Sequence, residues 1–530
     1  MNSRNDTTVD PEKSTALQLD HRSLLDTVES MWPQIAPIQG ARLRDAVRSV
    51  PEAEWNRRPR ILLAVAASHR SIGSTSRSAA LPWLRAVDKS IRADPHTPLD
   101  IRAGYLIQLA TTLRTLGDQV KAREHLESVR RMLEDDLSAD VSARVDLSAS
   151  FSLQLGLVRI HVGEFDEALF ALSLAEGLAD EHLSAAERVE CHSALAYVSL
   201  QLGDFVEAER QVELAVEHAE GTDLLRSQFA ALTAVTRFVL LVERAALGAD
   251  FAGPLRDLRI TSRNSDWEPL ALYAEALGKH AVGSWIEALD LLGRVTRILA
   301  GFTGRLVLET ESRILHAESM RNLGELEQSH RALGLLDHGQ HHAPCPHRLL
   351  ALASFRLGDP QAALDALAGC LEAGSLHSAR TIAQVYAIAS AAHHDLGDSI
   401  ASAIAFDRAL LAAALNGVSW PFRILPAEVL ERLLTRAAER FQPAIVTPLI
   451  ERMHVAPRTD SQPLADPLSE RELVIVRHLT TGATLSQIGG ELFISVNTVK
   501  SHVRSIYRKL SATNRREAIA RAEQLGLADD

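Results

Sequence analysis

Along most of the chain, apolar residues recur every three to four positions, which is the spacing of one face of an α-helix. In one clear example, an apolar face over residues 194–202 is followed by Gly203 and then by a second apolar face over residues 205–219. Glycine adopts positive φ readily, so it suits the turn between two paired helices. The pattern predicts a helical hairpin.

This hairpin pattern repeats with a short phrase of Gly, usually an acidic residue, three variable positions and a small residue. The copies are GDQVKA at Gly117, GEFDEA at Gly163, GDFVEA at Gly203, GSWIEA at Gly283, and the weaker GELEQS at Gly324, GDPQAA at Gly358 and GDSIAS at Gly397. They are 34–46 residues apart, except for one interval of 80 that equals two periods. Such a period is typical of stacked helical hairpins, and the small residue after each turn lets paired helices approach closely.

The chain is therefore predicted to be all-α, with four segments. A polar tail and helical lead-in (1–59) precede a helical-repeat array (60–445), a linker rich in Pro and polar residues (446–466) and a terminal four-helix domain (467–530). The caps of the four helices are Ser469 with Glu472, Thr484 with Gln487, Ser495, and Asn514 with Glu517. Gly482 is expected to end the first helix, and Phe493 and Ile494 to form the turn before the third.

The second and third helices are spaced as a helix-turn-helix, whose second helix fits the major groove of DNA. In the third helix an inward face is predicted from the 3–4 spacing of Val499, Val503, Ile506 and Leu510. Lys500, Ser501 and Arg504 must then face outward, where Lys500 and Arg504 can donate to guanine O6 and N7. Phosphate contacts are predicted for Thr484, Thr498, Tyr507, Arg508 and Lys509.

This terminal segment resembles the DNA-binding domain of the LuxR family of regulators over residues 468–527. The resemblance is carried by Leu468, Arg471, Glu472, Gly482, Ile488, Leu492, Phe493, Ile494, Ser495, Thr498, Val499, Lys500, His502, Lys509, Leu510, Asn514, Arg515, Glu517 and Ala518. It implies base contacts by Lys500, Ser501 and Arg504. It also implies a dimer contact on the fourth helix, through Asn514, Ala518, Ala522 and Leu525. The chain departs from the family pattern at Gly489 and Gly490, and at Leu473 and Val474.

The array and its lead-in (residues 42–66) resemble the tetratricopeptide-like sensor region of regulators related to the maltose regulator. This resemblance implies a concave surface for a small-molecule or protein effector, and RNA polymerase as a partner if the protein activates transcription. The phosphate-binding motif of the ATPase domain in many such regulators, G-x-x-x-x-G-K-[ST], does not occur in this sequence. An alternative is a protein-binding adaptor whose terminal bundle docks a partner; an ATP-driven switch would require nucleotide hydrolysis.

Charge and composition further restrict the class of protein that the sequence predicts. The net charge is −12, but residues 496–516 carry six Lys or Arg and no acidic residue, which suits phosphate binding. The first fifteen residues are polar, and no charge-free stretch is long enough to cross a bilayer, so the expected location is the cytoplasm. No nucleophile elbow G-x-S-x-G occurs, so we expect no enzyme activity and no cofactor.

Two groups of residues with ligand chemistry have simple interpretations. The three cysteines, Cys191, Cys345 and Cys370, form no C-x-x-C pair and are expected to be free thiols. His338, His341, His342, Cys345 and His347 form a His-rich tract. Imidazole and thiolate suit zinc, but the spacing matches no established site, so a solvated loop without metal is favoured over a metal site.

Overall fold

The structure is a computed structural model. It describes residues 21–31, 40–70, 78–135, 141–244, 252–282, 284–304, 306–322, 329, 333, 345–356, 358–373, 377–440, 442–455, 468–492, 494–510, 512, 515–524 and 527. Within these ranges the fold is all-α, as predicted: there is no β-strand, only an isolated bridge between Asp118 and Thr303. No helix among the described residues is both long enough and apolar enough to span a membrane.

The chain divides into two compact units. Unit 1 contains Met1–Phe238, Asp250–Ala271 and Arg297–Val307, and unit 2 contains Val239–Ala249, Leu272–Thr296 and Leu308–Asp530. The first thirteen labelled helices, in chain order, are α2 (His21–Met31), α3 (Gly40–Ser49), α4 (Pro59–Ser68), α5 (Leu81–Ala93), α6 (Leu99–Thr115), α7 (Gln119–Asp135), α8 (Val141–Val162), α9 (Phe165–Glu176), α10 (Ala179–His182), α11 (Ala185–Leu202), α12 (Phe205–His218), α13 (Ala231–Glu243) and α14 (Ala252–Ser262). Three 3-10 turns lie among them: η1 (Glu52–Glu54), η2 (Leu224–Arg226) and η3 (Gln228–Ala230).

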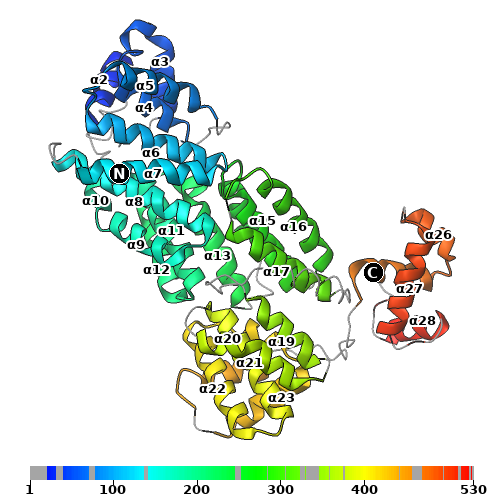
Figure 1. Cartoon of the computed structure of the whole chain (residues 1–530). Helices are drawn as coiled ribbons and strands as arrows, with labels where there is room; N and C mark the ends of the chain where they lie inside the picture. Colours follow the sequence, from blue (N-terminus) through cyan, green and yellow to red (C-terminus); the bar gives the residue numbers. More distant parts are fainter. Residues whose placement is uncertain are drawn as a thin grey trace, which may run out of the picture. The chain divides into compact units, whose positions relative to one another are not determined.

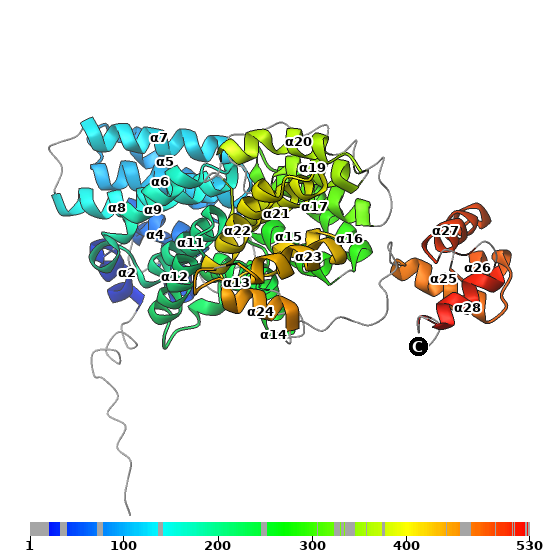
Figure 2. The ribbon, with the colours of Figure 1, turned by 90° about the horizontal axis from the view of Figure 1, so that it is seen from below.

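Unit 1 is built from helical hairpins that pack on their neighbours. The pairs α6–α7, α8–α9 and α11–α12 are hairpins, α8 packs on the α6–α7 pair, and α11 packs on α9. Figures 1 and 2 show these helices side by side in chain order. The predicted stack of hairpins is therefore present in this unit.

The turn at Gly203 shows why the repeat phrase has its composition. Gly203 ends α11 with φ 87°, in the left-handed region, and its N–H bonds to the carbonyls of Ser199 and Leu200. Asp204 then begins α12 by accepting a hydrogen bond from the Glu207 N–H. The described repeat glycines all share positive φ: Gly117, Gly163, Gly203, Gly358 and Gly397.

The small residue five positions after each repeat glycine is buried, as its predicted packing role requires. These residues are Ala122, Ala168, Ala208, Ala288, Ser329, Ala363 and Ser402, none more than 3% exposed. A larger side chain at these positions would separate the paired helices, because protein interiors are close-packed. The phrase thus encodes both the turn and the contact that follows it.

A buried ion network lies inside unit 1. The Arg114 side chain is fully buried and pairs with the carboxylate of Asp266, and its Nη2 lies 3.5 Å from Glu190 Oε1. Arg70 approaches the same Glu190 oxygen at 2.5 Å, and His161 Nε2 lies 3.0 Å from Asp266 Oδ2. Burial raises the pKa of Asp266, but the surrounding cations outweigh it and hold that pKa well below its usual range. Each buried charge in this network therefore needs an oppositely charged partner, and removing one partner would leave the other charge buried and unpaired.

The remaining helices before the terminal domain are α15 (Glu268–Ala281), α16 (Trp285–Leu299), α17 (Val307–Asn322), α19 (Pro346–Arg356), α20 (Pro360–Ala373), α21 (Ala379–Asp395), α22 (Ser399–Leu415), α23 (Ala427–Ala438) and α24 (Thr447–Val455), with η5 (Trp420–Ile424). In unit 2, α19–α20 and α21–α22 are hairpins, and α20 packs on α21. The repeat architecture therefore also occurs in this unit.

The linker begins later than its predicted start at residue 446. Residues 447–455, assigned to the linker by their position after the array, form helix α24, which packs on α23. Leu449 and Ile450 are buried there, so apolar contacts extend the array beyond residue 445. The Pro-rich part of the linker, 456–467, lies outside the described residues.

Candidate nucleic-acid interface and ligand cavity

The terminal domain contains four helices, α25 (Glu470–Thr480), α26 (Leu485–Glu491), α27 (Val496–Lys509) and α28 (Arg515–Gln524). Ser469 and Glu472 form the predicted capping box at the start of α25. Gly482 follows the end of that helix with φ 85°, as expected. The inward residues Ile475, Val476 and Leu479 belong to one core with the apolar face of α27.

The helix-turn-helix consists of α26 and α27, which pack against each other. Thr484 and Gln487 form the predicted capping box of α26, and the Ser495 hydroxyl accepts the N–H of Thr498 at the start of α27. Arg471 supports the turn from outside by donating from Nη2 to the Leu492 carbonyl at 2.8 Å. Phe493 lies outside the described residues.

Gly489, a departure from the family pattern, has a steric reason in this structure. It is buried, and a Cβ added there would lie 2.9 Å from the Ile494 carbonyl oxygen, closer than real Cβ contacts allow. Gly490, in contrast, is exposed and has no atom within 4 Å of an added Cβ. Only the first glycine is therefore required by the tight approach of the turn to α26.

Helix α27 has the two faces that its sequence predicted. Val499, Val503, Ile506 and Leu510 are all buried, with at most 7% exposure. Lys500, Ser501 and Arg504 are exposed. The helix thus presents two cations with a small residue between them, which permits close approach to base edges in a groove.

The residues predicted to contact phosphate lie in different environments. Thr484 and Thr498 are exposed at the N-termini of α26 and α27, where backbone N–H groups favour anions. Their hydroxyls also hold the caps, since Thr484 Oγ1 bonds Gln487 Oε1 at 2.9 Å and Thr498 Oγ1 bonds Ser495 Oγ at 2.8 Å. Tyr507 is half-buried. The Arg508 side chain lies outside the described part of the chain.

The prediction that Lys509 contacts phosphate is wrong. Its side chain is 0% exposed, and its Nζ donates to Glu472 Oε2 at 2.9 Å. Lys509 lies at the edge of the apolar face of α27, so its side chain turns inward toward the first turn of α25. Arg515 also serves the fold, because its Nη2 donates to the Leu479 carbonyl at 2.8 Å and satisfies the end of α25.

The prediction of a dimer contact through Ala518 and Ala522 is also wrong. Both residues are buried in the core of their own domain, at 2% and 0% exposure, where α28 packs on α25 and α27. Small side chains on α28 allow this packing, and they leave neither residue on the surface. Asn514 and Leu525, the other two members of that set, lie outside the described residues.

Comparison with known proteins defines the class of this domain. The family model described as "Bacterial regulatory proteins, luxR family" matches residues 466–522. Residues 466–522 are therefore a LuxR-family helix-turn-helix domain, consistent with the two-faced α27 helix and its supporting caps.

Two curated relatives that match the chain carry the same name. The chain is 32% identical over 76 residues to the HTH-type transcriptional regulator MalT of Serratia proteamaculans (strain 568). It is 33% identical over 76 residues to the protein of the same name from Klebsiella pneumoniae (strain 342). The match covers 14% of this chain and only 8% of the length of each relative.

A second feature with binding chemistry is a cavity of about 370 Å³ in unit 2. The side chains that give it polar character are His280, Trp285, Glu318, Arg321, Asn322, Arg356 and Gln384. Glu318 is already paired, since both Nη atoms of Arg348 donate to its carboxylate, at 3.4 and 3.0 Å. The Glu318 carboxylate in the cavity wall is therefore already paired with a cation from outside the wall.

Arg321 is the notable group in this wall. Its side chain is 8% exposed, and its Nη2 lies 3.4 Å from Asn322 Oδ1 and 4.0 Å from Glu318 Oε1. Its buried Nε and Nη1 have no hydrogen-bond partner among the described residues. Burial lowers the pKa of Arg321 to about 10, which still leaves the guanidinium charged near neutral pH. A buried cation with spare donors is suited to an anionic ligand.

Proposed function

We propose that this protein is a transcription regulator that reads double-stranded DNA through α27 and responds to a small anionic effector bound in its helical array. The observation that supports DNA reading is the outward presentation of Lys500, Ser501 and Arg504 from a helix whose opposite face is buried. Arg or Lys donating to guanine in the major groove is a common specific contact in such domains. Regulation, rather than catalysis, is also what the matched family describes.

The test uses the purified full-length chain and sheared genomic DNA. Bound fragments are sequenced for the wild type and for a Lys500→Ala/Arg504→Ala variant, beside an Arg477→Ala control, whose exposed side chain lies on α25. We expect discrete enriched sites for the wild type and the control, and none for the double variant. Equal enrichment by the double variant would overturn the proposed role of α27.

Selection in vitro avoids dependence on an inducing signal in the cell. Affinity for an enriched site should also fall steeply as salt is raised, because each phosphate contact releases condensed counterions. The double variant should lose about 1–3 kcal/mol of binding free energy for each base contact removed, mostly at the bases that those side chains read.

The effector part of the proposal is supported by the cavity around Arg321. A ligand with a carboxylate or phosphate group would pair with the Arg321 guanidinium, and Trp285 would offer an apolar surface beside it. A panel of small carboxylates and phosphates is screened by thermal shift of the full-length chain. Arg321→Lys keeps the charge but loses the forked donor geometry, and the exposed Arg294→Ala serves as control.

Stabilisation by a panel member in the wild type and in Arg294→Ala, but reduced in Arg321→Lys, would support the cavity as the effector site. Equal stabilisation in all three chains would place the ligand elsewhere. The regulator proposal is tested separately, since it depends on DNA binding by α27.

A second candidate function, protein binding by the array, is favoured by an apolar stripe on α22. Ile400, Ile404, Leu411 and Leu415 are 76, 52, 41 and 55% exposed, and their spacing puts them on one side of the helix. An adaptor would lose its protein contact in Ile400→Asp/Ile404→Asp and keep it in Lys500→Ala/Arg504→Ala. A DNA-binding regulator would instead lose DNA binding in Lys500→Ala/Arg504→Ala and keep it in Ile400→Asp/Ile404→Asp.

A further inference from the structure

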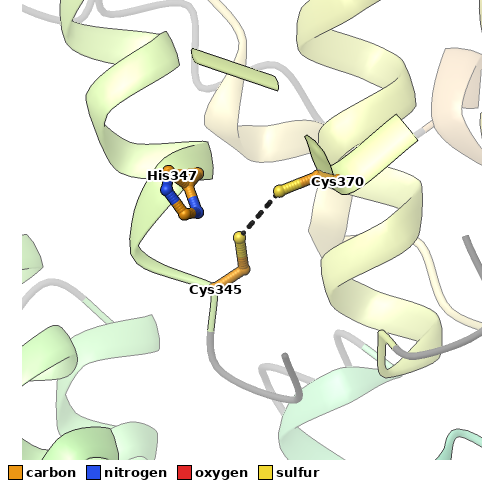
Figure 3. Close-up of side chains that lie close together, drawn as sticks. All are labelled: Cys345, His347 and Cys370. Carbon is orange, nitrogen blue, oxygen red and sulfur yellow. Dashed lines mark hydrogen bonds between the residues drawn. The ribbon is translucent and has the colours of Figure 1, made fainter. Parts of the chain in front are cut away.

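Three residues with metal-ligand side chains converge at the ends of neighbouring helices in unit 2. Cys345 directly precedes α19, His347 lies in the first turn of α19, and Cys370 lies near the end of α20. Figure 3 shows the two sulfur atoms facing each other with the His347 ring beside them. One ligand atom from each residue lies within 4.8 Å of the other two.

Cys370 is distant in sequence from the other two residues of this cluster, so sequence spacing alone did not predict it. Cys345 and His347 belong to the His-rich tract, whereas Cys370 follows Cys345 by 25 positions. The hairpin of α19 and α20 brings it back to the same place. His338, His341 and His342 lie outside the described residues, so the cluster shares only Cys345 and His347 with the tract that the sequence singled out, and Cys370 is new to it.

The spacing of the ligand atoms fits a tetrahedral metal site better than a disulfide. The sulfur atoms of Cys345 and Cys370 are 3.3 Å apart, whereas a disulfide bond is about 2.05 Å long. In a tetrahedral zinc site, with Zn–S near 2.3 Å and Zn–N near 2.0 Å, ligand atoms lie roughly 3.3–3.8 Å from one another. The two sulfurs would need to separate by only about half an ångström to hold such an ion.

Further polar groups gather at the Cys345 sulfur. It interacts with the Cys370 sulfur at 3.3 Å, with the His347 and His377 side chains, and with the backbone of Arg348 in the first turn of α19. His377 is 5% exposed and lies just before α21, so a fourth ligand-type side chain reaches the same sulfur.

We propose that Cys345, His347 and Cys370 bind one zinc-class divalent ion, with His377 as the fourth ligand, and that the ion joins the start of α19, the end of α20 and the start of α21. Two thiolates and two imidazoles are a common ligand set for structural zinc. Both sulfurs would coordinate as thiolates, so metal binding releases to solvent each thiol proton that the pair still carries at the working pH.

The test is metal uptake by the full-length chain under reducing conditions. The chain is loaded with Zn²⁺, desalted and assayed for metal, and a second sample is loaded with Co²⁺ and examined for thiolate-to-cobalt charge-transfer absorption. We expect about one Zn²⁺ per chain, and charge-transfer bands that Zn²⁺ displaces. Absence of a stoichiometric ion, or a Cys345–Cys370 disulfide in the reduced preparation, would overturn the proposal.

Variants locate the ion. Cys345→Ser and Cys370→Ser should lose the retained metal and the charge-transfer bands, while Cys191→Ser, which removes a buried cysteine in α11, should keep both. A His338→Ala/His341→Ala/His342→Ala chain should also keep them. Loss of metal in that chain, with retention in the cysteine variants, would assign the ion to the His-rich tract and refute the cluster.

A second readout guards against misfolding of the variants. An ion that binds only the folded state stabilises it and raises the unfolding temperature, more so as the free ion concentration rises above Kd. Zn²⁺ should therefore raise the melting temperature of the wild type and Cys191→Ser, and a chelator should reverse the rise. Melting temperatures of the wild type that are identical with Zn²⁺ and with chelator would contradict the proposed joining role.

Discussion

The ammonium Nζ of Lys509 lies 2.9 Å from Oε2 of Glu472, and neither side chain is more than 4% exposed. The pair joins the end of α27 to the first turn of α25, so it helps to orient the helix that presents Lys500 and Arg504. Burial raises the pKa of Glu472, but hydrogen bonds from the Ser469 N–H, Ser505 and Lys509 outweigh it and leave that pKa below its usual value.

Removing Lys509 should destabilise the terminal domain without removing a DNA contact. Lys509→Met leaves the buried Glu472 charge without its ion-pair partner, and breaking a buried pair in this way costs about 3–5 kcal/mol. Hydrogen exchange of the α25 and α27 amides in the full-length chain measures the loss.

Lys509→Met/Glu472→Gln should lose less stability than the single variant, because glutamine in place of Glu472 would keep the capping box without a buried charge. Lys500→Met, a change at an exposed lysine on the same helix, is the control and should exchange like the wild type. Exchange rates for Lys509→Met that match this control would show that the pair contributes nothing to stability.

Adjacent glycines in α26 should respond oppositely to alanine. Gly489→Ala places a Cβ 2.9 Å from the Ile494 carbonyl oxygen and should cost about 1–3 kcal/mol through overpacking. Gly490→Ala meets no atom within 4 Å and should stabilise α26 by about 1 kcal/mol, because alanine favours helix. Hydrogen exchange of α26 in the full-length chain checks both, and equal effects in the two variants would contradict the tight turn.

Alanine should reduce the stability of the fold by different amounts at two of the repeat glycines. Gly397 has φ +83° and open space, so Gly397→Ala should cost only the left-handed strain of about 1–2 kcal/mol. Gly117 has φ +92°, and a Cβ there would lie 2.7 Å from Phe302 Cδ1, so Gly117→Ala should cost more. Thermal unfolding of each variant tests this order.

A smaller side chain at position 302 should relieve part of the cost at Gly117. Gly117→Ala/Phe302→Leu should therefore be less destabilised than the sum of the two single variants, because their effects share one contact. Additive effects of the two changes would rule out the predicted clash.

Burial of Glu311 should make unit 2 lose stability as pH rises. Desolvation raises the pKa of this carboxyl from its usual 4.5 to about 7, so the folded state holds a proton that the unfolded state has lost. The stabilising contribution is complete below pH 4.5 and is lost as pH rises toward about 7. A shift of this size corresponds to roughly 3 kcal/mol.

The measurement is the difference in unfolding free energy between the wild type and Glu311→Gln from pH 5 to pH 8. Glutamine does not titrate, so the wild type should lose stability relative to this variant up to about pH 7 and then stay level with it. The exposed Glu428→Gln is the control and should track the wild type. A difference that does not vary with pH would show that Glu311 is ionised throughout.

Much of the array follows from local sequence. The repeat glycines have the positive φ that their place between helices required, and the small residue five positions later is buried in every described copy. Period and apolar spacing also predict the hairpins α6–α7, α8–α9, α11–α12, α19–α20 and α21–α22. The end of the array did not follow, because α24 lies in a short segment whose burial depends on contact with α23 rather than on a repeat phrase.

In the DNA-binding domain, the caps and the two faces of α27 were predictable because they depend on spacing within one helix. Lys509 and Ala518 were not, since both were interpreted from family resemblance and residue type alone. A lysine at the edge of an apolar stripe is drawn inward only if a carboxylate lies opposite, and Glu472 comes from a helix 37 positions earlier.

The sequence by itself determined the all-α class, the repeat period, the helix caps and the exposed Lys500, Ser501 and Arg504, because each depends on residues within a turn or two of the chain. Only the tertiary structure decided the pairing of Lys509 with Glu472, the inward placement of Ala518 and Ala522, the cavity at Arg321 and the meeting of Cys345 with Cys370. Those relationships join residues from separate helices, and such contacts form only when neighbouring helices pack to bury their apolar faces.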